Sequence, residues 1–341
     1  MNPRQFQALA TASATCLATL IAFALQMDDP WWAAISAWIV SHPEKQFVFK
    51  KGLMRIVGNL AGCGIGYVVA TATAGWILTQ WVIMVFAFSA AVYMRFTARY
   101  AYAWAMFWVI LALTVLTSEQ DPSLVSEFAY FRAIEIVTGV AAATFVSITI
   151  EAWRPDLAGE GKPVGQVTDA DRRKAVYPAV FGGGAALLIL LLWNYFALPS
   201  IFQILVSLFT AMAPTIAQMR QQISMRLGGC LLGGTLGVVV TGLGIETLWI
   251  WMMLFFVGIY FASLLHHNET EHAYIGTQAG VAFVICMVAD SGPQQSILPV
   301  IDRAVGITLA YIVLACLLVL IVPWVRGQSK ESGSNVTMAK G

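Results

Sequence analysis

The sequence predicts an all-α membrane protein with about twelve membrane segments, arranged as two parallel six-segment repeats in which the second segment of each is short or broken. Three observations carry this prediction: the composition, an internal repeat and the lengths of the apolar stretches. Hydrophobic residues make up 59% of the 341 residues and charged residues only 11%, and the mean hydropathy is +0.76. Such a chain has too little polar surface to cover a soluble domain, so we expect it to lie in a bilayer.

The internal repeat has an offset of 171 positions. Residues 54–70 read MRIVGNLAGCGIGYVVA and residues 225–241 read MRLGGCLLGGTLGVVVT, so that eight of seventeen positions are identical. The shared core is one arginine followed by three glycines at four-residue spacing, which lie on one helix face and let another helix approach closely. Further identities keep the same offset: Ser36/Ser207, Pro43/Pro214, Arg132/Arg303 and Trp153/Trp324. We therefore expect that a whole unit was duplicated.

Six apolar segments are expected in each half, at 8–26, 31–42, 52–75, 77–94, 100–117 and 129–151, then at 175–197, 200–213, 222–244, 247–265, 273–290 and 300–324. The second of each six is too short to cross about 30 Å of hydrocarbon at about 1.5 Å per residue. A half-crossing or broken element is therefore expected after Pro30 and after Pro199. Irregular backbone at membrane depth must be buried in protein or line a cavity, and transporters bind substrate beside it.

Charge predicts the orientation and the domain boundaries. If the N-terminus is cytoplasmic, seventeen of the nineteen Lys and Arg fall at cytoplasmic ends of segments. Both termini then face the cytoplasm, and an even number of crossings per unit makes the repeats parallel. The expected divisions are a first membrane repeat, a cytoplasmic linker, a second membrane repeat and a disordered cytoplasmic tail, at 1–153, 154–174, 175–325 and 326–341.

Arg132 and Arg303 are the two basic residues assigned to the far side of the membrane, about a turn inside the sixth and twelfth segments. A guanidinium at membrane depth is costly and usually faces a water-filled cavity or a partner, so these arginines are the first candidates for binding an anionic substrate. Glu135 lies three residues after Arg132 and on the same helix face, which fits a structural ion pair, a proton-coupling group, or both. Position 306 is glycine, so Arg303 has no corresponding neighbour.

Arg55 and Arg226 begin the two glycine stripes, close to the expected cytoplasmic ends of their helices. Either side chain alone would be expected to snorkel to the membrane surface, whereas recurrence in both halves favours a shared role in substrate binding at the cytoplasmic mouth. Trp31 and Trp32 follow Pro30 at the expected break. They fit an interfacial aromatic belt, and they also offer flat surfaces to an aromatic ligand.

Several other functions find no support in the sequence. The five cysteines all lie inside apolar stretches, which indicates packing and neither disulfides nor zinc binding. The histidines at 266, 267 and 272 are expected in a solvated loop rather than in a metal site. No nucleophile motif, phosphate-binding loop or nucleic-acid motif is visible. We therefore expect no enzyme activity, no cofactor, no metal and no nucleic-acid partner.

The residues Pro30-Trp31-Trp32-Ala33, Ile39 to Pro43, Arg55-x2-Gly58-x3-Gly62 and Arg132-x2-Glu135 resemble the fusaric acid resistance and aromatic acid exporter family of bacterial inner-membrane proteins. That family is distantly similar to plant aluminium-activated malate transporters. The resemblance implies export of small, mostly aromatic carboxylates, often with a periplasmic membrane-fusion protein. Many members carry a large cytoplasmic domain between the repeats, where this chain has the short linker at 154–174.

Together these observations predict a multi-pass protein of the bacterial inner membrane that exports small organic carboxylates, driven by the proton gradient. A passive organic-anion channel would use the same arginines for selectivity and need no titrating acid. A membrane scaffold or accessory subunit, in which the arginines only pair with acids, is the other alternative. The substrate, the coupling ion, the oligomeric state and the adaptor partner stay open at this stage.

Overall fold

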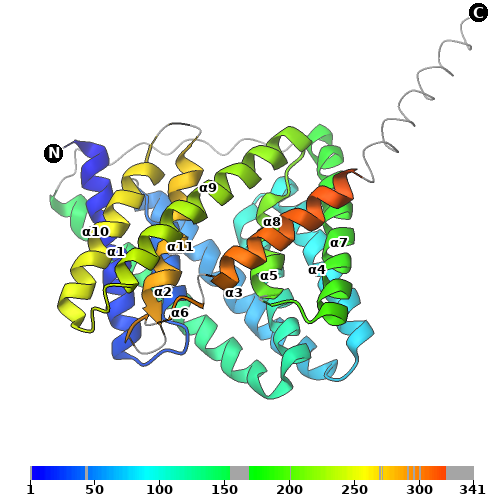
Figure 1. The fold of residues 1–341 in the computed structure, drawn as a ribbon. Coiled ribbons are helices and arrows are strands. Elements are labelled where there is room, and N and C mark those ends of the chain that lie inside the picture. The colour runs from blue at the N-terminus through cyan, green and yellow to red at the C-terminus, as the bar shows by residue number, and fades with distance from the viewer. Residues whose placement is uncertain are drawn as a thin grey trace, which may run out of the picture.

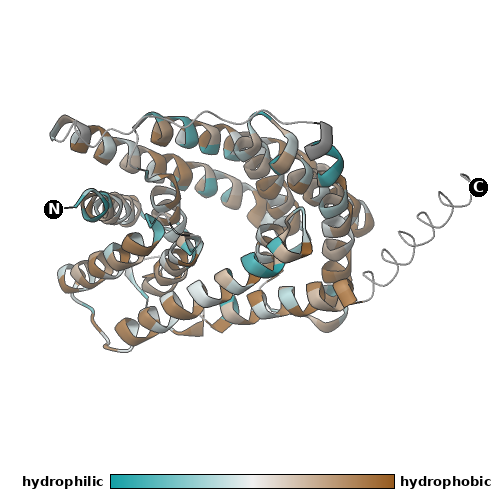
Figure 2. Ribbon diagram, turned by 90° about the horizontal axis from the view of Figure 1, so that it is seen from above, coloured by the Kyte–Doolittle hydropathy of each residue, from teal (hydrophilic) through white to brown (hydrophobic). Residues whose placement is uncertain are grey.

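The computed structural model describes residues 2–42, 45–153, 169–199, 201–268, 270, 272–289, 292–294, 296–298 and 301–319. These residues form an α-helical protein with one ribbon of two short strands, β1 (Val288–Ala289) and β2 (Gly292–Pro293). Most of the expected linker and all of the expected C-terminal tail lie outside the described residues, as does Pro43 of the repeat pair Pro43/Pro214. Hydrophobic residues run along almost every helix (Figure 2).

The first half of the chain folds into six α-helices and one short 3-10 helix, shown from blue to green in Figure 1. Their bounds are α1 (Pro3–Ala24), α2 (Trp31–Val40), α3 (Lys45–Ala72), α4 (Ile77–Thr97), α5 (Ala101–Gln120), η1 (Pro122–Leu124) and α6 (Val125–Trp153). Pro3 and the Asn2 capping box start α1, and Pro30 precedes α2. Both follow the preference of proline for helix N-termini, where its missing N–H costs nothing.

The second half contains five labelled helices and one more after the β-ribbon. Their bounds are α7 (Asp169–Phe196), α8 (Ile201–Ala211), α9 (Ile216–Thr241), α10 (Leu248–His266) and α11 (Ala273–Met287), followed by the helix Ile301–Val319. All twelve expected apolar segments therefore coincide with helices, although α3, α6 and α7 begin earlier than predicted. Polar residues extend these helices beyond their apolar cores, and hydropathy alone does not reveal such extensions.

Nine helices in the described part of the chain are long and apolar enough to cross a membrane. The chain is therefore a multi-pass membrane protein. The two expected short segments are confirmed, because α2 has 10 residues and α8 has 11. At about 1.5 Å per residue each covers only about half of the hydrocarbon thickness. Helix α11, with 15 residues, is also shorter than a full crossing.

The glycine stripes are packing surfaces, as the sequence predicts. An added Cβ at Gly58 would lie 2.4 Å from the carbonyl oxygen of Ala103, and one at Gly233 would lie 2.0 Å from that of Ala279. The first contact joins α3 to α5 and the second joins α9 to α11. Only glycine permits backbones to approach this closely. The two stripes, 171 residues apart, thus bring corresponding helices together in each half.

Helices from opposite halves also pack in corresponding pairs. Helix α1 packs against α10, and α7 packs against α4, so the first helix of each half lies beside the fourth helix of the other (Figure 1). Helix α2 is buried between α1, α6 and α11. Its Trp38 is fully buried and donates from Nε1 to the Thr277 carbonyl oxygen at 3.2 Å. A short helix of the first half therefore contributes to the junction of the two halves.

Candidate functional site

Arg132 lies at the centre of a buried charged cluster at the start of α2. It lies seven residues after Val125, about two turns inside α6 and thus deeper than predicted. Its side chain is 3% exposed and makes ion pairs with Glu135, Nη1 to Oε2 at 3.1 Å, and with Asp29, Nη2 to Oδ2 at 3.2 Å. The other Glu135 oxygen accepts from the Asp29 backbone N–H at 2.9 Å. The Arg132–Glu135 ion pair predicted from the i, i+3 spacing is present.

Three aromatic rings surround the Arg132 guanidinium. Its carbon lies 4.0 Å from the ring centroid of Trp32, 4.8 Å from that of Phe128 and 5.9 Å from that of Trp31. Trp31 also donates from Nε1 to Asp29 Oδ1 at 3.0 Å. The predicted site residues Arg132, Glu135, Trp31 and Trp32 are thus brought together, and the faces of both indoles are directed at the arginine of the protein itself. Cation–π attraction and two carboxylates stabilise this buried charge.

Arg55 and Arg226 make the same contact in the two halves. Arg55 Nε donates to Ser36 Oγ at 3.1 Å, and Arg226 Nη2 donates to Ser207 Oγ at 3.2 Å. The two arginines are 4% and 3% exposed, so the expectation that they snorkel to the membrane surface is wrong. Each guanidinium instead joins a long glycine-bearing helix to the short helix before it, because the serine hydroxyl at membrane depth is the nearest acceptor.

The remaining contacts of these arginines differ between the halves. Arg55 Nη1 donates to Tyr102 Oη at 2.7 Å, whereas Arg226 Nη1 donates to Gln278 Oε1 at 2.7 Å. Arg303 is 5% exposed and donates from Nη1 to Gln203 Oε1 at 3.3 Å. Gln203 stands at the position that Trp32 occupies in the first half. The arginine that faces an indole in one half therefore faces an amide in the other.

The candidate arginines thus belong to three groups. Arg132 is held with two carboxylates and three aromatic rings. Arg55 bonds to neutral side chains on α2 and α5. Arg226 and Arg303 lie close enough to interact electrostatically, and no carboxylate in the described part of the chain forms an ion pair with either.

Several residues of these clusters were not expected from the sequence. Asp29 was noted only as a charge at the far side, and Gln203, Gln278 and Tyr311 were not noted at all. The 171-residue offset points to Gln203 once Trp32 is known to face Arg132. Nothing in the sequence pattern indicates that Tyr311, 7% exposed, lies beside the Arg226 and Arg303 pair.

Histidines gather where α1, α2 and α10 meet. His267 Nε2 bonds to Thr11 Oγ1 at 2.9 Å, and His266 Nδ1 bonds to Thr277 Oγ1 at 2.7 Å. Both rings are half-buried, so the expectation of a solvated loop is wrong for them. Burial lowers the pKa of His267 to about 3, aided by repulsion from His266, His42 and the nearby cations. Burial likewise lowers the pKa of His42 to about 4, with repulsion from Lys51. This end of the protein therefore holds neutral imidazoles at neutral pH.

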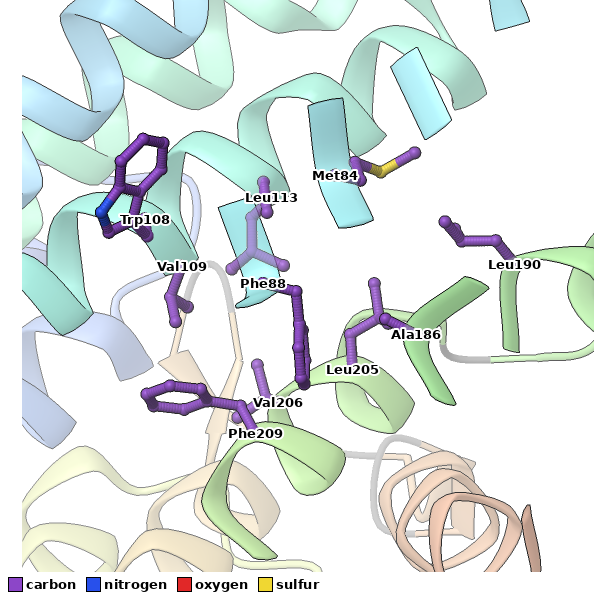
Figure 3. Close-up of a pocket in the computed structure, with 11 residues that line it drawn as sticks. Met84, Phe88, Trp108, Val109, Leu113, Ala186, Leu190, Leu205, Val206 and Phe209 are labelled. Atoms are coloured by element: carbon purple, nitrogen blue, oxygen red, sulfur yellow. The ribbon is translucent and has the colours of Figure 1, made fainter. Parts of the chain in front are cut away.

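An apolar pocket lies between α4, α5, α7 and α8 (Figure 3). The side chains of Phe88, Trp108, Leu190 and Phe209 point into it from the four helices. No charged side chain lines it. Helix α8 therefore contributes apolar side chains to this pocket as well as the polar contacts of Gln203 and Ser207 to the arginines.

Comparisons with known proteins agree with the family resemblance. Residues 17–146 match the family described as "Fusaric acid resistance protein-like". The p-hydroxybenzoic acid efflux pump subunit AaeB of Escherichia fergusonii is 26% identical over 147 residues, which cover 40% of this chain and 22% of that protein. The AaeB protein of Escherichia coli O1:K1 / APEC is also 26% identical, over 41% of this chain and 23% of its own length.

The match spans less than a quarter of the length of these relatives. No solved structure matches the chain significantly. The matched region runs from α1 to α6 and contains Trp31, Trp32, Arg55, Arg132 and Glu135. Through these residues the chain belongs to the fusaric acid resistance protein-like family, as its sequence motifs predict.

Proposed function

We propose that this chain is a secondary transporter that exports small, mostly aromatic carboxylates from the cytoplasm across the inner membrane. It would comprise two parallel repeats, 1–153 and 175–325, joined by a cytoplasmic linker at 154–174, with both termini in the cytoplasm. The corresponding helix contacts in the two halves support this arrangement. The names of the relatives support efflux of an aromatic acid.

The observation that carries this proposal is the burial of four arginines inside an apolar helical bundle. Arg55, Arg132, Arg226 and Arg303 are each at most 5% exposed. Burying one arginine at the centre of a bilayer costs about 3 kcal/mol even on the mildest scale. Four such costs at positions paired by the 171-residue offset indicate a shared use. Attraction of an anion along the junction of the two halves is the use that fits guanidinium chemistry.

Glu135 is the proposed proton-coupling group. It is fully buried and both of its oxygens are bonded, one to Arg132 and one to the Asp29 backbone at the start of α2. Protonation of Glu135 would weaken the contact that joins α6 to this short helix. Proton transfer would thereby change how α2 is held, which links the proton gradient to a movable element.

Transport in proteoliposomes tests the proposal. Purified protein is reconstituted, and uptake of radiolabelled 4-hydroxybenzoate is measured with and without an imposed pH gradient. A secondary transporter accumulates the acid above its outside concentration only while the gradient lasts, and dissipating the gradient with a protonophore abolishes accumulation. Liposomes without protein control for permeation of the neutral acid.

Two other results would replace the proposal. Equilibration of the labelled acid without accumulation would identify a passive channel. Absence of any protein-dependent flux would favour an accessory or scaffold role. Co-purification with a periplasmic membrane-fusion protein tests the proposed adaptor separately, and its outcome does not bear on transport by the chain itself.

A further inference from the structure

The two halves of the protein balance their buried arginines in different ways. Arg132 is paired with Glu135 and Asp29. At the corresponding positions of the second half, 171 residues later, the chain carries Gly306 and Ser200 in place of the two acids. The arginine is thus retained and both of its carboxylates are lost.

The second half adds a further positive charge near this position. Arg303 and Arg226 lie close enough for their charges to interact, and both are at least nine-tenths buried. The residues near them, Cys230 and Tyr274, are neutral. Two buried cations without a carboxylate partner among the described residues leave a charge that an apolar environment strongly disfavours.

Three buried donors around this pair have no hydrogen-bond partner within the described chain: Arg226 Nε, Arg303 Nε and Tyr311 Oη. Tyr311 interacts electrostatically with both arginines. Buried polar groups in native proteins are almost always bonded, so unpaired donors around a net positive charge indicate an acceptor that the chain itself does not supply.

We propose that Arg226, Arg303 and Tyr311, with Gln203, Gln278 and Ser207 holding the guanidinium groups, form the binding site for the carboxylate group of the transported acid. The solute takes the place that Glu135 and Asp29 fill in the first half, so one half carries an internal carboxylate pair and the other receives a carboxylate from solution. This inference rests on the proposed function only in taking the bound anion to be the exported solute.

The test measures binding directly. Stabilisation of the purified protein in nanodiscs, and binding of radiolabelled 4-hydroxybenzoate by scintillation proximity, are compared for wild type, Arg226→Gln and Arg303→Gln. Each variant is expected to weaken binding about tenfold or more, because a charge-assisted bond is lost. Arg220→Gln is the matched control, because Arg220 is an exposed arginine on the same helix as Arg226. The neutral analogue 4-hydroxybenzamide should not bind measurably.

A second variant avoids removing a guanidinium. Gly306→Glu restores the i, i+3 spacing of Arg132 and Glu135 and supplies the missing carboxylate from the chain. It should melt at a higher temperature than wild type and lose both ligand binding and further stabilisation by 4-hydroxybenzoate, whereas Gly306→Gln, of the same size but neutral, should keep binding at least about tenfold tighter than Gly306→Glu.

The inference is overturned if both arginine variants bind within about twofold of wild type, or if Gly306→Glu binds as tightly as Gly306→Gln. Stabilisation by inorganic phosphate, with none by the carboxylate, would also overturn it. Unaltered transport by arginine variants would refute this site and leave the proposed exporter standing. Binding that depends on Arg226 and Arg303 in a protein that transports nothing would refute the exporter and leave the site standing.

Discussion

Glu135, near the middle of α6, accepts a hydrogen bond from the backbone N–H of Asp29 at 2.9 Å, immediately before the short helix α2. The same carboxylate bonds to Arg132 through its other oxygen at 3.1 Å. One buried acid therefore fixes both an arginine and the entry of a half-length helix. Because the two bonds use different oxygens, a change in its charge acts on both.

Replacing Glu135 by glutamine tests its proposed coupling role. The amide keeps one oxygen acceptor but cannot exchange a proton, so Glu135→Gln should bind 4-hydroxybenzoate while losing accumulation against a gradient in proteoliposomes with an imposed pH difference. Equilibrium exchange of labelled acid, which needs no coupling, should persist.

Glu119→Gln is the matched control, since Glu119 is another carboxylate with a hydrogen bond, to Trp81 Nε1 at 2.7 Å, and lies at the end of a membrane helix. This control should keep gradient-driven accumulation. Normal accumulation by a well-folded Glu135→Gln protein would contradict the coupling role and favour a channel.

Removing the charge of Arg132 should destabilise the protein strongly. Arg132→Met leaves Glu135 buried without its cation, and breaking a buried pair in this way costs about 3 to 5 kcal/mol. The melting temperature in detergent should fall clearly. The double variant Arg132→Met, Glu135→Leu should recover most of the loss, because no uncompensated charge remains at position 135. A double variant no more stable than Arg132→Met would show that the ion pair is not the source of the effect.

Adjacent glycines on α9 should respond in opposite directions to the same change. A Cβ on Gly229 would lie 2.5 Å from the Ile275 carbonyl oxygen, whereas one on Gly228 would meet nothing within 4 Å. Gly229→Ala should therefore force α9 away from α11 and lower the melting temperature. Gly228→Ala should raise it slightly, since alanine favours a helix by about 0.5 to 1 kcal/mol over glycine. Equal effects of the two substitutions would refute the close helix approach.

Local signals in the sequence were sufficient for several of these features. Proline before α2, the lengths of the apolar stretches and the i, i+3 spacing of Arg132 and Glu135 depend on near neighbours, and the structure confirms the short helices and the ion pair. The glycine stripe also predicts close packing because its meaning is steric and independent of the partner helix.

Contacts between helices were not predictable in the same way. Ser36 and Ser207 share the 171-residue offset with Arg55 and Arg226, but nothing in the sequence joins each serine to its arginine. In a membrane protein the lipid-facing and protein-facing sides of a helix are both apolar, so the pattern gives little information on which sides meet. For the same reason Tyr311 was not recognised as a neighbour of the second arginine pair.

The proposed orientation can be tested by cysteine labelling in a variant without the native cysteines. Ser123→Cys, exposed in the turn between α5 and α6, should react with an impermeant maleimide added outside intact cells. Thr270→Cys, exposed between α10 and α11, should react only after permeabilisation. The reverse pattern would contradict the charge-based orientation and move Arg132 and Arg303 towards the cytoplasmic side.

The half-buried His267 should make the protein less stable in mild acid. Its pKa is lowered to about 3 by burial and by neighbouring positive charges, whereas an unfolded histidine titrates near about 6.5. Neutral His267 therefore favours the folded state fully above about pH 6.5, and this contribution is lost progressively as the pH falls towards the folded pKa. His267→Gln, which can still bond to Thr11, should lose less of its melting temperature than wild type between about pH 7.5 and about pH 5.5. His272→Gln alters an exposed histidine in the same loop and should behave as wild type. An unchanged acid sensitivity of His267→Gln would show that the destabilisation arises from other groups.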